Sequence, residues 1–490
     1  MRPTILAAAL PALCIASAMQ ASAAPPAIQK QTLPNGLDVL VVESHAAPLV
    51  TVEIAARNGS MTEPPDYNGL SHLYEHMFFK ANAAIPTQEA WLARAHELGL
   101  DWNGTTNTER VNYYFTTTSD QLEPTLVFMR DAIVTPLFDP KELERERVVV
   151  TGEMDRNEGN PFYFWFKATT DRAFWKYPSR KDPLGNRKTV LATTVEQLRI
   201  IKERYYVPNN SVLIVTGDVS APAVFALAAR LFGGWQRAAD PFVEHPLVQH
   251  PPIPYSNVVV VQQPVRAVAG TFEWLGPSMA GEGIEMSYAA DLLALALLEP
   301  SSRFQRTLVD GGACLAVGLN WTTQLNTGPI SASFQAMPGQ TDACAKGILA
   351  ELPKLKEHGY FSDEELKSAA YRAELDQMQQ REKPSELAHN LSFWWTSAGL
   401  DYYLGYVDHL KKAGRDDIAR YLDGYVLGKP FVFGVLVSPE MVKEQHLDAA
   451  HFEQLLGAKP WVQPVEPAAP AARPGEAKKT PAPTKAGGAK

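Results

Sequence analysis

A histidine pair on one face of a helix is the feature that most constrains this chain. Residues 71–77 read Ser-His-Leu-Tyr-Glu-His-Met, in which His72 and His76 lie four residues apart and Glu75 directly precedes the second histidine. On an α-helix, positions i, i+3 and i+4 share one face, so two imidazoles and a carboxylate converge there. An apolar stripe beside these three residues predicts a helix over residues 68–80.

The chemistry of these side chains points to a metal site. Two neutral imidazoles are good ligands for Zn²⁺, which in catalytic sites takes a third protein ligand and keeps one position for water. A carboxylate beside that water can act as its general base, and the inverted His-x-x-Glu-His order is one of the zinc-peptidase motifs. The alternative is a chance match on a surface helix, which arises about one time in a hundred in a chain of this kind. The residues therefore favour zinc.

A second helix carries carboxylates that differ from their neighbours. Asp139 followed by Pro140 is a strong helix start and predicts a helix over residues 141–158. Glu146 and Glu153 lie two turns apart and share one face of this helix, and Val149 and Val150 between them imply that the helix is partly buried. A carboxylate on a partly buried helix is unusual unless it is paired or holds a metal.

The first 23 residues have the pattern of a signal peptide. Arg2 supplies a positive n-region, residues 5–18 are apolar, and Ala21-Ser22-Ala23 is a small-residue cleavage signature. The alternative, a short buried helix of the mature protein, is weaker because prolines follow at once. We expect the mature chain to be exported, to the periplasm or as a secreted protein.

The length of the chain and a weak internal repeat predict two related domains. A chain of 490 residues is expected to hold at least two domains, and a helix–turn–strand pattern near residues 194–218 recurs about 220 residues later. We read the chain as two copies of one α+β unit, with mixed or antiparallel sheets packed by helices. The expected divisions are a domain at 24–240, a proline-rich linker at 241–256, a second domain at 257–462, and a disordered Pro/Ala/Lys tail at 463–490.

Charge and hydropathy exclude some partners. The net charge of −9 gives no electrostatic footprint for nucleic acid. No apolar run after the first two dozen residues is long enough to cross a bilayer. Cys314 and Cys344 are too few for a cysteine-based structural zinc site, and they either form a disulfide or remain two buried thiols.

Several motifs together resemble the pitrilysin/insulinase family of zinc metallopeptidases, in particular its smaller members close to the mitochondrial processing peptidase. The resemblance runs over most of residues 33–439. Its landmarks are Asn35-Gly36, His72-Leu73-Tyr74-Glu75-His76, Asn103-Gly104-Thr105-Thr106, Glu146-Arg147 with Glu153, and Tyr206-x-Pro208-Asn209-Asn210. It implies two homologous domains that form one half of a clam-shell around a peptide.

The resemblance also implies a role for each candidate site residue. The zinc ligands would be His72, His76 and Glu153, and Glu75 would activate the bound water. Glu146 would orient a ligand histidine. Asn103 would lie in an edge strand to which a peptide substrate adds as a further strand; the alternative for Asn103 is an ordinary turn residue.

One departure from the family bears on partners. Active members usually carry an arginine followed seven residues later by a tyrosine in the second half, whereas Val309 and Ala316 stand near those positions here. We therefore expect either a sister subunit that lacks the zinc motif and supplies Arg and Tyr, or a homodimer. The predicted function is an exported zinc endopeptidase that hydrolyses unfolded peptides; the alternative is a non-catalytic or structural subunit of a family heterodimer.

Overall fold

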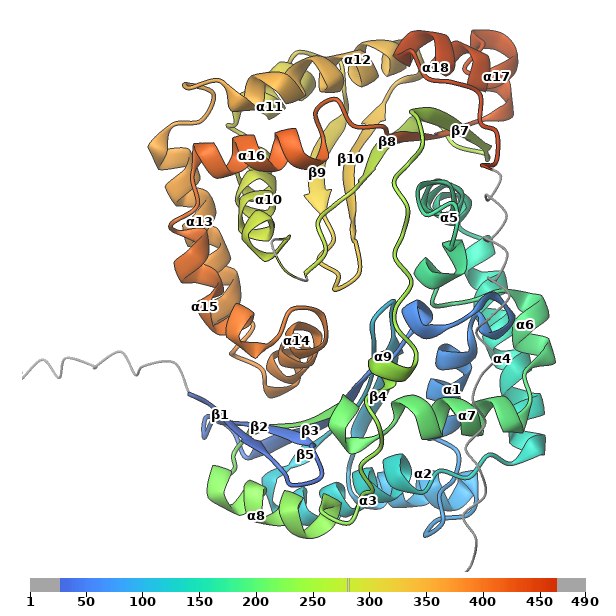
Figure 1. Ribbon diagram of the computed structural model, residues 1–490, viewed down its shortest axis with the longest axis vertical. Coiled ribbons are helices and arrows are strands. Elements are labelled where there is room, and N and C mark those ends of the chain that lie inside the picture. Colours follow the sequence, from blue (N-terminus) through green and yellow to red (C-terminus); the bar gives the residue numbers. More distant parts are fainter. Residues whose placement is uncertain (1–26, 280, 282, 465–490) are drawn as a thin grey trace, which may run out of the picture.

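The computed structural model describes residues 27–464 except 280 and 282. The expected signal peptide at 1–23 and nearly all of the expected tail at 463–490 lie outside the described residues. Two β-sheets, each packed by helices, make up the described chain (Figure 1). The prediction of an α+β protein built from two related units is confirmed. None of the described helices is both long and apolar enough to cross a membrane.

The strand order repeats from one sheet to the other. The first sheet has the order β1-β2-β6-β3-β5-β4 and the second has β7-β11-β8-β10-β9. In each sheet one pair is parallel, β2 with β6 and β7 with β11, and the remaining pairs are antiparallel. The strands are β1 (Ile28–Thr32), β2 (Asp38–Glu43), β3 (Leu49–Arg57), β4 (Asp101–Thr106), β5 (Arg110–Thr118), β6 (Ser211–Gly217), β7 (Asn257–Gln262), β8 (Val268–Leu275), β9 (Ala316–Trp321), β10 (Pro329–Ala336) and β11 (Val432–Val437). Apart from β1, the second sheet repeats the strand order of the first.

The helices follow the same repeat. The first unit, β1 to α8, contains α1 (Leu70–Phe78), α2 (Gln88–Glu97), α3 (Leu122–Val134), α4 (Pro140–Glu158), α5 (Pro161–Ala173), α6 (Arg187–Ala192), α7 (Val195–Tyr205) and α8 (Ala221–Phe232). A short helix, α9 (Pro241–Glu244), lies in the connection. The second unit, β7 to α18, contains α10 (Gly283–Leu298), α11 (Arg303–Gln305), α12 (Thr341–Glu351), α13 (Asp363–Gln379), α14 (Pro384–Ser397), α15 (Leu400–Leu410), α16 (Arg415–Tyr425), α17 (Pro439–Gln445) and α18 (Ala449–Leu456).

One helix of each unit packs on the sheet of the other unit. One face of the first sheet packs on helices of the first unit. The opposite face, which includes Leu40 and Ile214, packs on Leu391 of α14 from the second unit. In the second sheet, Ala269 and Leu436 pack on Trp165 of α5. In Figure 1, α14 lies over the lower sheet and α5 beside the upper one. Since successive residues of a strand point to opposite faces, the central strands β3, β6, β8 and β11 are buried on both sides.

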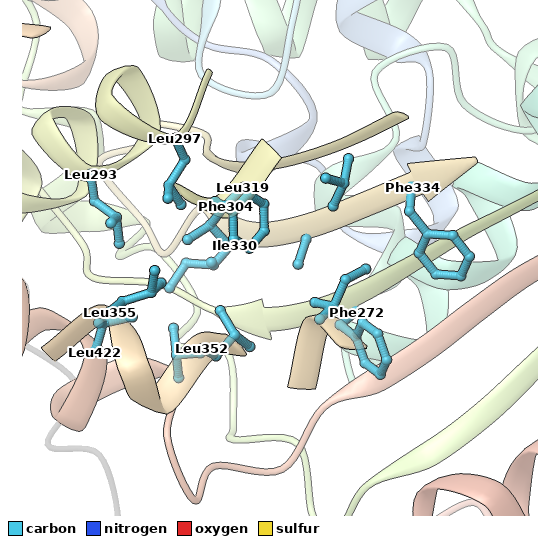
Figure 2. Close-up of a cluster of buried hydrophobic side chains, with 14 of the residues drawn as sticks. Phe272, Leu293, Leu297, Phe304, Leu319, Ile330, Phe334, Leu352, Leu355 and Leu422 are labelled. Atoms are coloured by element: carbon cyan, nitrogen blue, oxygen red, sulfur yellow. The ribbon is translucent and has the colours of Figure 1, made fainter. Parts of the chain in front are cut away.

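The main core of the second unit lies on the other face of its sheet. Figure 2 shows Ile330 of the sheet close to Leu297 of α10, with Phe272 farther away in the same cluster of buried side chains. Cys314, just before β9, is joined by a disulfide to Cys344 on α12, with their Cα atoms 5.0 Å apart. Of the two possibilities that the sequence leaves open for these cysteines, the structure contains the disulfide.

A buried glutamate joins the two units. Glu53 on β3 is fully buried, and its carboxylate accepts hydrogen bonds from Asn112 at 3.0 Å and from Ser392 of α14, and pairs with His389 of α14. Arg110 donates to Ser392 Oγ and to the His389 carbonyl, both at 2.7 Å. These contacts fix α14 to the first sheet.

We expect Glu53→Ala to lower the free energy of unfolding by about 3 kcal/mol, because it leaves buried donors without their acceptor. Urea unfolding followed by circular dichroism measures the change. The matched control is Glu123→Ala, which removes an exposed pair with Arg230 and should cost no more than about 1 kcal/mol. Equal losses for the two variants would contradict the role of Glu53.

Candidate metal centre

Helix α1 holds the two histidines and is fixed at its first turn. It begins at Leu70, after Gly69 in a left-handed conformation with φ of 92°. The buried carboxylate of Glu63 accepts hydrogen bonds from the backbone N–H of Gly69 at 2.8 Å and of Ser71 at 2.6 Å. These are donors that a helix leaves unsatisfied at its start. The helix predicted over 68–80 is confirmed, and its ends fall within two residues of that range.

Helix α4 packs against α1 and carries the two carboxylates. It starts as predicted: Asp139 accepts from the backbone N–H of Lys141 at 2.7 Å, and Pro140 is the first helical residue. The side chain of Glu146 is 7% exposed and that of Glu153 is 29% exposed. Both carboxylates reach the histidines of α1, because Glu146 lies within hydrogen-bond distance of His76 and Glu153 lies 3.4 Å from His72.

Three donor atoms form a triangle between the helices. His72 Nε2 lies 3.3 Å from His76 Nε2 and 3.4 Å from Glu153 Oε2, and the third side, His76 Nε2 to Glu153 Oε2, is 3.7 Å. Zinc binds nitrogen and oxygen at 2.0–2.2 Å, so its tetrahedral donors lie roughly 3.3–3.6 Å apart. The three separations match these values to about 0.1 Å. The residues fit one zinc ion with a fourth position free. In the part of the chain that the structure describes, they are the one cluster of this kind.

Glu146 contacts His76 at the ring nitrogen that faces away from the triangle. Its Oε2 lies 3.0 Å from His76 Nδ1, and its Oε1 lies 2.7 Å from Lys80 Nζ. A carboxylate on the far nitrogen fixes the tautomer and ring orientation of a metal-ligating histidine. Within residues 27–464, the corresponding nitrogen of His72 is buried without a hydrogen-bond partner. Among the described residues, only His76 therefore has a carboxylate on the ring nitrogen that faces away from the triangle.

Glu75 is held by strand β4 rather than by a charged partner. It is 8% exposed, and its Oε2 accepts a hydrogen bond from Thr106 Oγ1 at 2.9 Å. Gly104 lies against it so closely that a Cβ there would come within 2.9 Å of Glu75 Cγ and 3.0 Å of Oε1. The strand thus needs glycine at this position for the carboxylate to keep its place.

The charges around the triangle suit a metal and a base. Burial lowers the pKa of His72, and the neighbouring His76 lowers it further. A hydrogen bond with His76 holds the pKa of Glu153 below its usual value, against the effect of burial. Burial raises the pKa of Glu75, and the neighbouring His76 and the hydrogen bond from Thr106 offset only part of that rise. His72 is therefore neutral, Glu153 is ionised, and Glu75 is a better proton acceptor than an ordinary carboxylate. Against the effect of burial, hydrogen bonds with Glu146 and Glu153 raise the pKa of His76 to about 9, so zinc must displace a proton from His76.

All the candidate residues face one open cavity of about 720 Å³. Asn103 also lines it, from β4 at the edge of the first sheet, where it is exposed. Lys80 and Thr106 line it as well, and sequence reasoning missed both. Lys80 follows His76 by four residues, so the helical period could have placed it on this face. Thr106 belongs to one of the family landmarks, but nothing in the sequence assigned a role to its hydroxyl.

Two family models match the chain over this architecture. One, described as "Insulinase (Peptidase family M16)", matches residues 38–182, and the other, "Peptidase M16 inactive domain", matches residues 192–370. The first match contains α1, α4 and β4, which hold the candidate site.

Named relatives share part or most of the chain. The zinc protease PqqE of Helicobacter pylori is 24% identical over 384 residues, which cover 76% of this chain and 84% of that protein. Bovine insulin-degrading enzyme is 27% identical over 45% of this chain, but the match spans only 22% of its own length. The activity and substrates of that enzyme therefore belong to a much longer protein.

Solved structures show the same fold. A protease from Helicobacter pylori superposes with a TM-score of 0.75 at 21% identity and covers 84% of this chain and 100% of that one. The first half of the periplasmic protease PqqL from Escherichia coli superposes with a TM-score of 0.70 at 19% identity, over 88% and 97% of the two chains.

Proposed function

The chain belongs to the insulinase (peptidase M16) family, and on this premise we propose that it is a zinc-dependent endopeptidase that hydrolyses unfolded peptides. The observation that carries the proposal is the triangle of His72, His76 and Glu153, with Glu75 beside it in the same cavity. A purely structural zinc site has a closed set of four ligands and needs no neighbouring base.

In the proposed reaction each side chain has its own task. Zinc held by His72, His76 and Glu153 would acidify a water molecule and polarise the scissile carbonyl. Glu75 accepts the proton of the attacking water on its carboxylate and passes it to the leaving amine. Thr106 keeps one oxygen of Glu75 occupied, which leaves the other for proton transfer.

The edge strand β4 is the proposed binding site for the peptide backbone. It pairs with β5 on one side only, so the main-chain groups of its other edge can bind an added strand. Asn103, exposed on this strand, is proposed to contact the peptide. A peptide must be extended to bind in this way, which favours unfolded substrates.

A sister subunit remains part of the proposal. Among the described residues that line the cavity of the zinc donors there is neither an arginine nor a tyrosine. We propose that a partner without the zinc motif supplies both; a homodimer is the other possibility. Purification from the native host with identification of co-eluting chains tests this, and a fully active homodimer would exclude the sister subunit.

Export to the periplasm is proposed on two grounds. Residues 1–23 have the pattern of a signal peptide, and the similar protein PqqL is described as a periplasmic protease. Fractionation of the native host, with the amino-terminal residue of the recovered chain determined, tests both the location and the cleavage after residue 23.

The test of the function is cleavage of an unfolded peptide library by the purified chain, together with its metal content. We expect zinc near one equivalent, cleavage products, loss of cleavage with a chelator and recovery on adding zinc. A chain that binds zinc but cleaves nothing, alone or with its native partner, would support the non-catalytic alternative instead.

Glu146→Gln is expected to weaken zinc binding by about 10- to 100-fold, because the carboxylate that orients His76 loses its charge. Competition with a zinc-binding dye measures the affinity. Glu144→Gln, the same change at an exposed site on α4, should leave the affinity unchanged. Equal affinities for the two variants would mean that Glu146 does not position His76.

A further inference from the structure

The second unit contains a cavity in the place that corresponds to the candidate metal centre. Helix α10 follows β8 as α1 follows β3, β9 is the edge strand as β4 is, and α12 and α13 follow β10 as α3 and α4 follow β5. Between α10, α13, α14, α15 and β9 lies an open cavity of about 510 Å³. The repeat thus keeps a hollow at this position, although no histidine lines it among the described residues.

A carboxylate that pairs with no positive side chain of the described residues lies in this cavity. Asp291 of α10 lines it and accepts one hydrogen bond, from Tyr406 Oη at 2.9 Å. Among the described residues that line the cavity there is no lysine, arginine or histidine, whereas a second carboxylate, Asp376, stands exposed on α13. Burial raises the pKa of Asp291 to about 7, and only the hydrogen bond from Tyr406 opposes it. A desolvated carboxylate of this kind is costly to ionise unless a cation joins it.

The walls of the cavity are aromatic. Trp394, Phe393, Trp321, Tyr403 and Tyr406 all line it. The rings of Trp394 and Tyr406 lie 6.0 Å apart, and both contact Tyr402, at 5.0 and 5.7 Å. These side chains are held by one another before any ligand arrives. Aromatic faces attract cations and also accept the methylene stem of a long side chain.

We propose that this cavity binds one organic cation, the side chain of a lysine or arginine residue, with its charged group on Asp291 and its stem against Trp394 and Tyr406. The described residues that line the cavity supply a carboxylate, no positive side chain to pair with it, and aromatic walls. That the lysine or arginine belongs to a peptide substrate rests on the proposed function; binding of the cation does not. The other account is that Asp291 stays protonated as a structural group beside Tyr406.

The test is equilibrium binding to the full-length, zinc-free protein by isothermal titration calorimetry. The probes are Nα-acetyl-lysinamide and Nα-acetyl-argininamide, with Nα-acetyl-norleucinamide as the uncharged analogue of similar shape. We expect the neutral probe to bind at least about tenfold more weakly than the cations. Asp291→Asn should weaken binding of the lysine probe by a similar factor. Asp408→Asn, the same change at an exposed position on α15 outside the cavity, should have no effect.

A second variant keeps the test decisive if Asp291→Asn does not fold. Asp376→Asn changes an exposed residue at the cavity and is expected to weaken cation binding about threefold. The inference is overturned if neither cation binds saturably, if norleucinamide binds as well as lysinamide, or if both variants bind like the unchanged protein. Because the probes are not cleaved and no zinc is present, such a result would leave the proposed peptidase function untouched.

Discussion

Replacing Glu75 by glutamine is expected to lower kcat/KM for peptide cleavage by about 10³-fold while the zinc content stays unchanged. Glutamine has nearly the same shape and still offers Thr106 an oxygen, so the contact with β4 survives. It cannot accept a proton, and Glu75 is the group proposed to do so. Zinc is retained because the three donor atoms belong to other residues. Cleavage of a quenched fluorescent peptide and metal analysis of the same preparation measure both quantities.

The control for this variant is Glu89→Gln, the same chemical change at an exposed position on α2. It should cleave peptides at the unchanged rate. Cleavage that survives in Glu75→Gln would exclude Glu75 as the base. Loss of zinc together with activity would instead mean that Glu75 belongs to the metal site, and the assignment of ligands would then be wrong.

Glu153→Ala is expected to weaken zinc binding by about 10³-fold. Sites with a full set of ligands bind zinc with apparent free energies of roughly 10–16 kcal/mol, so the loss of one of three protein ligands removes a large share. His72 and His76 lie on one helix and remain in place without Glu153, so some affinity persists. Competition with a zinc-binding dye at fixed pH measures the change.

Glu144→Ala provides the comparison on the same helix. It removes an exposed carboxylate and should leave zinc affinity within a factor of two, which separates loss of a ligand from loss of a negative charge. If the two variants bind zinc equally well, the carboxylate of α4 is not a ligand, and the geometric basis of the proposed site fails.

The helical period of the sequence was enough to place the two histidines and Glu75 on one face. The sequence also predicted the start of α4, because Asp139 is a strong N-cap residue and Pro140 is favoured at the first helical position. The approach of Glu153 to the histidines is different. It depends on how two helices pack, and the resemblance to a family implied it where the residue spacing alone could not.

Nothing in the sequence predicted that one helix of each unit packs on the sheet of the other unit. Helices α5 and α14 each pack on the sheet of the other unit, whereas hydrophobic periodicity shows only that a helix has a buried face and not which surface covers it. Glu53 illustrates the same limit. A glutamate in the middle of an apolar strand looks out of place until His389, Ser392 and Arg110 are seen around it.

The central claim is that His72, His76 and Glu153 together hold one zinc ion. Anomalous diffraction at the zinc absorption edge, from crystals of the zinc-loaded protein, tests it most directly. We predict one strong peak at about 2.0–2.2 Å from His72 Nε2, His76 Nε2 and Glu153 Oε2. A peak elsewhere, or no peak between α1 and α4, would contradict the account.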